Sequence, residues 1–444
     1  MSTQLSSDVL QRLETQWGAS DARAGMANAI ARNSLRSLAV KQDPFRSMQH
    51  TFSIELQTGK MTAQNASGRC WLFAGLNALR FATMKKLNVE TFEFSQNYQM
   101  FWDKLEKVNF FLESILRTLD EPTEGRLVNW LLGAPLNDGG QWDMFVNLVD
   151  KYGVVPKYAM PETFHSSNTG EMNWLLTTRL REDAARLRNA YQEGVSVEAL
   201  RARKEGMLGE AYRMLCECLG EPPKKFDFEY HDKDNKYFQY PGITPAEFTE
   251  KFVPMVAHDY VSLIHAPTAD KPFNRLYTVK FLGNVEGGRD VLYLNVEMPT
   301  LKRLALAQLQ DGEPVWFGCD VGKMMDRDTG ILDAHLLDFQ SLLDMPFGLN
   351  KAERLDYRES VMTHAMVFLG VNLVNGVPNR WKVENSWSEK AGRDGYFVMS
   401  DEWFDEYLYQ VVVHKKYLSP DMLATFEQEP IRLEPWDPMG SLAH

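Results

Sequence analysis

The sequence contains few cysteines for its length. Four occur in 444 residues: Cys70, Cys216, Cys218 and Cys319. Four are too few for a disulfide framework, and the spacing Cys216-Glu-Cys218 differs from the Cys-x-x-Cys of zinc sites and redox pairs. We expect these two to be structural thiols on an amphipathic helix, and Cys319, within an apolar run, to be a core residue. This leaves Cys70 as the cysteine whose surroundings need another explanation.

Long apolar runs and long basic runs are also missing. No stretch approaches the roughly 18 uninterrupted apolar residues of a membrane helix, and the first ten residues lack the regions of a signal peptide. The formal net charge is −12, without a run of Lys and Arg that would attract nucleic acid or an anionic membrane. We therefore expect a cytoplasmic protein that binds neither membranes nor nucleic acid.

The composition is that of an ordinary folded globular protein. Hydrophobic residues make up 44% and charged residues 24%, far from the profile of disorder. The length exceeds the roughly 250 to 300 residues at which a single core stops growing, so we expect two or more subdomains. We find neither an internal repeat nor a low-complexity tract.

Hydrophobic periodicity divides the chain into a mainly helical first half and a β-rich second half. Helices are predicted over 70–87, 95–119, 172–219, from the glycine pair at 139–140 to about 152, and from the capping box at 244–247. After residue 256, short runs rich in β-branched and aromatic residues predict strands at 276–282, 291–296, 315–319, 365–371, 380–384 and 395–399.

Cys70 lies at the predicted N-terminus of a helix. The thiolate is the nucleophilic form of cysteine, and the unpaired N–H groups of a helix N-terminus stabilise a negative charge there. A histidine must supply the remaining stabilisation of the thiolate, and a third group must orient the imidazole. Gln64 lies six residues before Cys70, and its side-chain amide together with the backbone N–H of Cys70 could receive an oxyanion.

His364 is the best candidate for that histidine among nine. It begins an apolar predicted strand, where a lone histidine is on base rates more often a core residue than a catalytic one. Asn385 follows 21 residues later, in a second predicted strand, with Trp387 close by to exclude water. We expect the Asn385 carbonyl to accept the Nδ1–H of His364, which leaves Nε2 for the sulfur of Cys70.

The set Gln64, Cys70-Trp71, His364-Ala365 and Asn385-Ser-Trp387 resembles the papain-type cysteine peptidases. Two departures are informative. Ser67-Gly-Arg lacks the disulfide cysteine that precedes the nucleophile in secreted relatives, which agrees with a reducing cytosol. The histidine lies 294 residues after the cysteine (364 − 70), against roughly 130–150 in papain, so a large insertion separates the two halves of the site.

Nearly the whole chain is similar to the bleomycin hydrolase and bacterial aminopeptidase C branch of that fold. The motifs are Ser67-Gly-Arg-Cys-Trp, Phe94-Ser-Gln-Asn-Tyr with Phe101-Trp-Asp-Lys, Asp138-Gly-Gly-Gln-Trp-Asp, Trp381-Lys-Val-Glu-Asn-Ser-Trp and Trp436-Asp-Pro-Met-Gly. The resemblance implies an α+β, papain-like fold. We expect an N-terminal covering segment (1–60), a helical half (61–164), a mainly helical insertion (165–290), a β-rich half (291–418) and a C-terminal arm (419–444).

By the same resemblance, the enzyme is a thiol aminopeptidase that acts on short peptides with a free N-terminus and needs no metal or organic cofactor. Gly139 and Gly140 would line the substrate cleft, because only glycine lets an extended peptide approach the backbone closely. Trp71 and Trp387 would shield the site. Members of the family are usually hexameric rings, so we expect a homo-oligomer.

The resemblance also implies that the C-terminal arm lies in the cleft and holds the free amino group of a substrate through its terminal carboxylate. The family acts through a carboxylate on the residue that corresponds to Ala443, and this chain carries His444 beyond it. One extra residue adds about 3.3–3.6 Å. Three explanations stay open: His444 is added to the natural chain, it is trimmed by Cys70, or the specificity has moved toward endopeptidase action. We favour the first two.

Two alternatives to an aminopeptidase follow from the sequence. Within the same family the chain could be an oligopeptidase or endopeptidase. The C-terminal arm is the feature that distinguishes these activities from that of an aminopeptidase. In another class it could be an inactive papain-fold scaffold or a nucleic-acid-binding protein. The intact set of Gln64, Cys70, His364 and Asn385 argues against a scaffold, and the net charge of −12 argues against nucleic acid.

Overall fold

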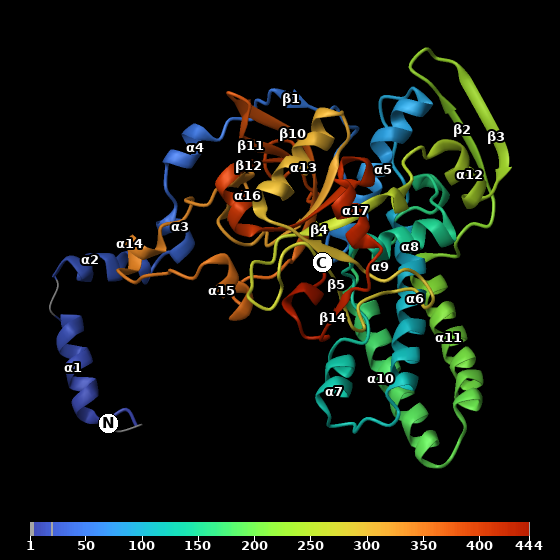
Figure 1. Cartoon of the computed structure of the whole chain (residues 1–444), viewed down its shortest axis with the longest axis horizontal. Helices are drawn as coiled ribbons and strands as arrows, with labels where there is room; N and C mark the ends of the chain where they lie inside the picture. The colour runs from blue at the N-terminus through green and yellow to red at the C-terminus, as the bar shows by residue number, and fades with distance from the viewer. Residues whose placement is uncertain (1–3, 19–20, 444) are drawn as a thin grey trace.

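A computed structural model describes residues 4–18 and 21–443. The N-terminal segment forms four short helices and one short strand, and its first two helices extend away from the body of the molecule (Figure 1). These elements are α1 (Ser7–Gly18), α2 (Asp21–Ile30), α3 (Leu35–Ala39), α4 (Asp43–Ser47) and β1 (Ile54–Glu55).

The helical region that follows carries Cys70 at its first helical residue. Its helices are α5 (Cys70–Leu87), α6 (Gln96–Arg117), α7 (Arg126–Gly133) and α8 (Trp142–Tyr152). Asn88 ends α5 in the left-handed conformation, and the Ser95 side chain caps α6 by accepting the N–H of Tyr98. Gly153 ends α8 with a φ of 68°. The predicted helices over 70–87 and 95–119, and the one ending near 152, are confirmed.

Two long helices and a hairpin fill most of the stretch from 164 to 252. The elements are α9 (Phe164–Ser167), α10 (Gly170–Gln192), α11 (Val197–Leu219), β2 (Phe226–His231), β3 (Tyr237–Ile243) and α12 (Pro245–Phe252). In Figure 1, α10 and α11 lie beside the lower end of α6, and the hairpin of β2 and β3 stands at the opposite end of the molecule. The capping box at Thr244 and Glu247 is present as predicted.

Twelve strands of the described residues form one sheet in the order β14-β5-β6-β4-β13-β7-β10-β11-β12-β9-β8, with β1 paired to β10. The strands not yet placed are β4 (Tyr260–Ile264), β5 (Arg275–Val279), β6 (Tyr293–Asn295), β7 (Val315–Cys319), β8 (Met325–Asp326), β9 (Ile331–Leu332), β10 (His364–Val374), β11 (Val377–Glu384), β12 (Tyr396–Ser400), β13 (Leu408–His414) and β14 (Ile431–Leu433). All six strands predicted after residue 256 are present.

Further helices accompany these strands: α13 (Met298–Gln310), α14 (Phe339–Leu343), α15 (Lys351–Asp356), α16 (Asp401–Tyr407) and α17 (Pro420–Phe426). Short 3₁₀ turns are η1 (Lys157–Ala159), η2 (Ala257–Asp259), η3 (Lys415–Tyr417) and η4 (Pro438–Gly440). One hydrophobic core joins the helical region to the sheet and includes Cys70 and Trp71, and a second core includes Cys319 on β7.

The architecture is α+β, as predicted. The strands β4 and β5 lie within the stretch 165–290 and join the main sheet, so the sheet draws on more of the chain than its last third. The five segment boundaries proposed from the sequence stay a prediction. For the site, the decisive packing is that of α5 against β10, because it brings the N-terminus of the Cys70 helix to the strand that begins with His364.

Candidate active site

Cys70 is the first residue of α5 and is fully buried. Burial raises the pKa of its thiol to about 12, although the backbone N–H groups of Ala365, Trp71 and Cys70 itself favour the thiolate. The contact with Ala365 places the sulfur beside the residue that follows His364. In this environment a solitary thiol stays protonated at neutral pH, so a nearby base is needed to make it a nucleophile.

His364 begins β10, and Asn385 follows directly after β11, its antiparallel neighbour. The two side chains meet: the Nε2 of His364 lies 2.9 Å from the Oδ1 of Asn385, and both residues are buried. The sequence-based expectation that Asn385 holds Nδ1 is therefore wrong. The reason is geometric, since the ring is placed by the register of the strands, which the sequence does not give.

The two tryptophans predicted to shield the site occupy different positions. The ring of Trp387 lies 4.9 Å from that of His364, centroid to centroid, at an interplanar angle of 36°, and covers the imidazole. Trp71 instead packs beneath the glycine loop, where its indole N–H donates to the backbone oxygen of Asp138 at 2.7 Å. Trp387 thus lies beside the histidine, whereas Trp71 supports the loop.

Gln64 is fixed by two contacts to its side-chain amide and one to its backbone. Its Oε1 accepts a hydrogen bond of 2.6 Å from the Ser386 hydroxyl, and its Nε2 donates to the Ser67 carbonyl at 2.6 Å. The Ser67 hydroxyl in turn donates to the Gln64 carbonyl at 2.5 Å. Because Ser386 follows Asn385 directly, one short segment after β11 positions both the histidine partner and the glutamine. An Nε2 group has a second N–H, which can serve as an oxyanion donor.

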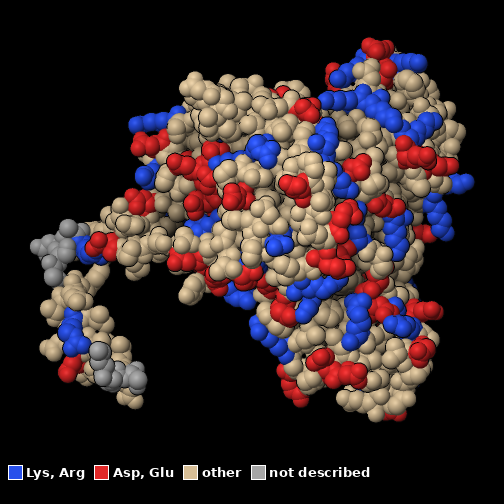
Figure 2. All heavy atoms as spheres, in the orientation of Figure 1, with Lys and Arg blue, Asp and Glu red and all other residues tan. Residues whose placement is uncertain are grey.

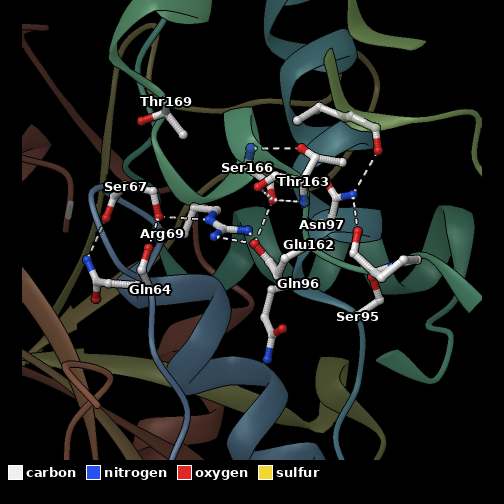
Figure 3. A network of polar contacts seen from close by, with 12 residues as sticks. Gln64, Ser67, Arg69, Ser95, Gln96, Asn97, Glu162, Thr163, Ser166 and Thr169 are labelled. Carbon is white, nitrogen blue, oxygen red and sulfur yellow. Dashed lines mark hydrogen bonds and ion pairs between the residues drawn. The ribbon is translucent and has the colours of Figure 1, made fainter. Parts of the chain in front are cut away.

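Sequence reasoning missed an ion pair beside the nucleophile. Arg69 and Glu162 form a two-fold contact, with Nη1–Oε1 at 3.1 Å and Nη2–Oε2 at 2.8 Å. Arg69 directly precedes Cys70, and Figure 3 shows its side chain extending to Glu162. Arg69 also donates to the Ser67 hydroxyl, and Glu162 accepts from the Ser166 hydroxyl. Burial raises the pKa of Glu162, but Arg69 outweighs it and the net shift is downward. The pair anchors the turn that leads into α5.

A second buried ion pair joins the two halves of the site. Arg80 on α5 and Glu384, the last residue of β11, approach to 2.6 Å, and both side chains are almost fully buried. Burial raises the pKa of Glu384, and Arg80 opposes this. Since Glu384 directly precedes Asn385, this pair ties the strand of the histidine partner to the helix of Cys70.

Gly139 and Gly140 lie on a loop that buried lysines hold in place. The ammonium of Lys107 donates to the Gly139 carbonyl at 2.6 Å, and that of Lys104 pairs with Asp138 at 2.5 Å. Burial would raise the pKa of Asp138, but Lys104 and hydrogen bonds from Lys104, Thr169 and Asn173 hold it well below its usual value. The loop is therefore fixed from below by charged groups.

The structure gives Gly140 a requirement that the sequence did not reveal. A Cβ added there would lie 2.4 Å from Cε2 of Trp71, closer than atoms can approach. Position 140 therefore requires glycine because of the tryptophan beside it; its predicted role in lining the cleft stays a prediction.

The C-terminal arm lies along this loop. The N–H of Gly140 donates to the Ala443 carbonyl at 3.1 Å in an antiparallel bridge, and the Gln141 side chain donates to the Ser441 carbonyl at 2.7 Å. On its other side, the Ser441 hydroxyl donates to the Met362 carbonyl at 2.6 Å. Ala443 is fully buried. His444 lies outside the described residues. The arm is thus ordered over the loop that was predicted to line the cleft.

Among the residues that the structure describes, no cluster of three or more His, Cys, Asp or Glu side chains could hold a metal ion. In residues 4–18 and 21–443, no helix is both long enough and apolar enough to cross a membrane.

Comparison with known proteins decides the family. The family model described as Peptidase C1-like family matches residues 4–440. The chain belongs to the Peptidase C1-like family. The chain is therefore a cysteine peptidase, and the predicted branch of bleomycin hydrolase and aminopeptidase C is confirmed. The mixed sheet with its helical region is the expected papain-like α+β fold.

Relatives in this Peptidase C1-like family are similar over the full length of the chain. "Aminopeptidase C" of Listeria monocytogenes is 50% identical over 443 residues, covering 100% of both chains. "Bleomycin hydrolase" of Homo sapiens is 45% identical over 426 residues, covering 94% of each. The crystal structure of pepW from Lactobacillus rhamnosis HN001 is 49% identical, covers 100% of both chains and superposes with a TM-score of 0.98.

Proposed function

We propose that this chain is a cytoplasmic thiol aminopeptidase that releases N-terminal residues from short peptides through an acyl-enzyme intermediate. The observation that carries the proposal is the meeting of three parts at one place: the Cys70 sulfur beside Ala365, the imidazole of His364 held by Asn385, and the arm paired to Gly140. The relatives named Aminopeptidase C support the exopeptidase form of this activity.

The chemistry begins with a proton transfer. His364 takes the thiol proton of Cys70 on Nδ1, and Asn385 holds Nε2 so that the imidazolium stays oriented. The thiolate attacks the carbonyl of the first peptide bond, and the oxyanion is received by the backbone N–H of Cys70 and the second N–H of Gln64. His364 then gives its proton to the leaving amine, and the C–N bond breaks.

Deacylation repeats these roles with water. His364 takes a proton from the water, whose oxygen attacks the thioester carbon, and the same oxyanion donors serve again. Collapse of the intermediate returns the proton to the sulfur of Cys70 and releases the free amino acid. Every atom and proton is supplied by substrate, water and this chain.

The arm supports cleavage at the N-terminus. Ala443 occupies the pairing position at Gly140 that an extended substrate would need, so a long substrate cannot lie on both sides of Cys70. A carboxylate at the end of the arm pairs with the substrate's ammonium, which an N-blocked peptide lacks. The mass of the chain separates trimming from the other two explanations of His444: loss of this residue on incubation, in a Cys70-dependent manner, supports trimming.

Self-association belongs to the same proposal. Helix α1 stands apart from the body, and its apolar residues are exposed: Leu10 by 42%, Leu13 by 51% and Trp17 by 63%. Burial of this apolar face against another copy of the chain lowers the free energy of the assembly, and an isolated protomer leaves the face in water. We propose a homo-oligomer, a hexamer by family resemblance, which light scattering or native mass spectrometry tests.

The nucleic-acid alternative has less support. Lys and Arg side chains are interspersed with Asp and Glu over the visible face, which gives no continuous basic surface there (Figure 2). The inactive-scaffold alternative predicts a protein whose Cys70 reacts no faster than an ordinary buried thiol.

The test of the proposed nucleophile is the turnover of a short fluorogenic peptide with a free N-terminus. Cys70→Ala abolishes turnover while the unfolding temperature stays near that of the wild type, and Cys218→Ala, at a partly buried position on α11, keeps full activity. Residual activity above a few per cent in Cys70→Ala would reject Cys70 as the nucleophile.

A further inference from the structure

An apolar cavity of about 750 Å³ lies beside the candidate active site, between α6, α7 and the C-terminal arm. Gly68, Gly139, Gly440 and Leu442 line it together with aromatic and aliphatic side chains. The large apolar residues of its wall are Phe110, Phe111, Trp130, Leu131, Phe281 and Leu282. None of these six carries out a step of the proposed mechanism.

The inner end of the cavity is close to the nucleophile. Gly68 is two residues before Cys70, and its N–H donates to Asp138 at 2.9 Å. Gly139 directly precedes Gly140, on which the arm is paired. Two of the lining residues therefore belong to the segments that flank the sulfur and the cleft.

The direction of the arm indicates which substrate residue faces the cavity. Leu442 lines the cavity, whereas Ser441 before it does not and instead donates its hydroxyl to the Met362 carbonyl. Neighbouring side chains of an extended chain point to opposite sides. A substrate residue that continues this path beyond Ala443 therefore directs its side chain to the side of Leu442. In the proposed function, which this inference rests on, that residue is the N-terminal one.

The charged groups at the cavity are already paired. The Lys107 ammonium contacts Asp103 at 2.7 Å and the Gly139 carbonyl at 2.6 Å. Asp138 is satisfied by Lys104, Thr169 and Asn173. A charged side chain that entered would lose water without gaining a counter-ion, whereas an apolar side chain gains from burial.

We propose that this cavity binds the side chain of the substrate's N-terminal residue and selects large apolar and aromatic side chains. Leu442 forms one of its walls, so the arm that limits cleavage to the N-terminus also shapes the pocket for the residue removed. Helix α7 supplies Trp130, Leu131 and Gly133 to the opposite wall.

The experiment measures how fast aminoacyl chloromethyl ketones alkylate Cys70 in the full chain, by intact-protein mass, because alkylation needs binding but no turnover. The probes carry Phe, Leu, Ala, Asp or Arg, and iodoacetamide serves as the reagent without a side chain. The Phe and Leu probes react at least about 10-fold faster than the Ala, Asp and Arg probes, since even one methylene in an apolar pocket changes binding about 10-fold or more.

Two variants test the assignment of the wall. Gly133 lines the cavity and a Cβ added there meets no atom within 4 Å, so Gly133→Trp adds a large ring at this wall without a clash. We predict that it lowers the Phe and Leu rates at least about 10-fold while the Ala rate changes less than about 2-fold. The matched control is Gly206→Trp, at an exposed glycine of α11 where an added Cβ likewise meets no atom within 4 Å. This substitution leaves the alkylation rates of all probes unchanged. Trp130→Glu, at a partly exposed wall position, shifts the preference from Phe to Arg.

Equal rates for all five probes, or equal effects of Gly133→Trp and Gly206→Trp on their ratios, overturn the assignment of the pocket. Failure of the aminopeptidase proposal gives a different result: an N-acetylated Phe probe then reacts as fast as the free one, while the preference for Phe and Leu persists. Alkylation by iodoacetamide but by none of the ketones would overturn both.

Discussion

Asn385 holds His364 by its Nε2 atom, at 2.9 Å, in the buried region where α5, the helix that begins with Cys70, packs against β10. The imidazole is further covered by Trp387. A histidine held in this way keeps one nitrogen bonded throughout the reaction, while the other exchanges protons. The catalytic proposal depends on this division between the two ring nitrogens, and the following variants probe it.

Asn385→Ala removes the acceptor that orients His364. A hydrogen bond to a charged imidazolium contributes about 1.5–3 kcal/mol, so we predict a loss of about 10- to 100-fold in kcat. KM for a short peptide stays nearly unchanged, because Asn385 is buried behind the histidine and does not contact substrate. Steady-state kinetics check this, and an unchanged kcat in a folded variant would contradict the role.

His364→Ala isolates the thiol. Burial raises the pKa of Cys70 to about 12, so without a base the thiolate fraction at pH 7 falls to about 10⁻⁵. We predict that iodoacetamide alkylates the variant very slowly at pH 7 and faster with rising pH, without a plateau below about pH 11. The wild type reacts at neutral pH, because His364 accepts the proton. Equal pH profiles for the two proteins would show that His364 does not ionise the thiol.

Gly140→Ala tests the packing of the glycine loop. The added Cβ would lie 2.4 Å from Trp71, so the loop or the ring must move. We predict that overpacking lowers the free energy of unfolding by about 1–3 kcal/mol and with it the unfolding temperature. The pairing between Gly140 and Ala443 of the arm is also weakened. The control is Gly206→Ala in α11, where the same change meets open space and a helix favours alanine. Similar stabilities for both variants would contradict this account of Gly140.

Asp138 links the loop to acid stability. Its pKa is held well below its usual value because Lys104 and hydrogen-bond donors outweigh burial. A carboxyl whose folded pKa is depressed stabilises the fold above its unfolded pKa of about 3.9 and loses that contribution as pH falls through the folded value. We therefore predict that Asp138→Asn costs more free energy of unfolding at pH 7 than at pH 3. A cost that is equal at the two pH values would contradict the ionised state of Asp138.

The helix and the strands that carry the candidate site residues could be predicted from the sequence, because these residues come in short local motifs; their catalytic roles stay a prediction. Cys70 at a helix start and His364 at a strand start were predicted from local pattern, and α5 and β10 confirm these positions. Asn385 was predicted within a strand, whereas it directly follows the end of β11. The sequence could not show that Asn385 contacts Nε2 of His364 rather than Nδ1, because this depends on how β10 and β11 position the two side chains.

Contacts between distant residues were likewise beyond the sequence. Arg69 and Glu162 are 93 positions apart, and Arg80 and Glu384 are 304 apart, so neither pair leaves a local pattern. The hairpin of β2 and β3 was missed because its alternating aromatic and charged residues lie in a stretch dominated by long helices. The need for glycine at position 140 was attributed to the substrate alone, because Trp71 meets it only in the folded chain.

The most direct test of the central claim compares one fluorogenic peptide with a free and an acetylated N-terminus, in the full chain and in a chain that ends at Gly440. A charge-assisted contact contributes about 1.5–3 kcal/mol, so we predict that the full chain cleaves the free peptide about 10- to 100-fold faster than the acetylated one. In the shortened chain, which lacks the segment paired to Gly140, this preference disappears and the acetylated peptide is cleaved. Comparable cleavage of both peptides by the full chain would contradict an aminopeptidase limited by its own C-terminal arm.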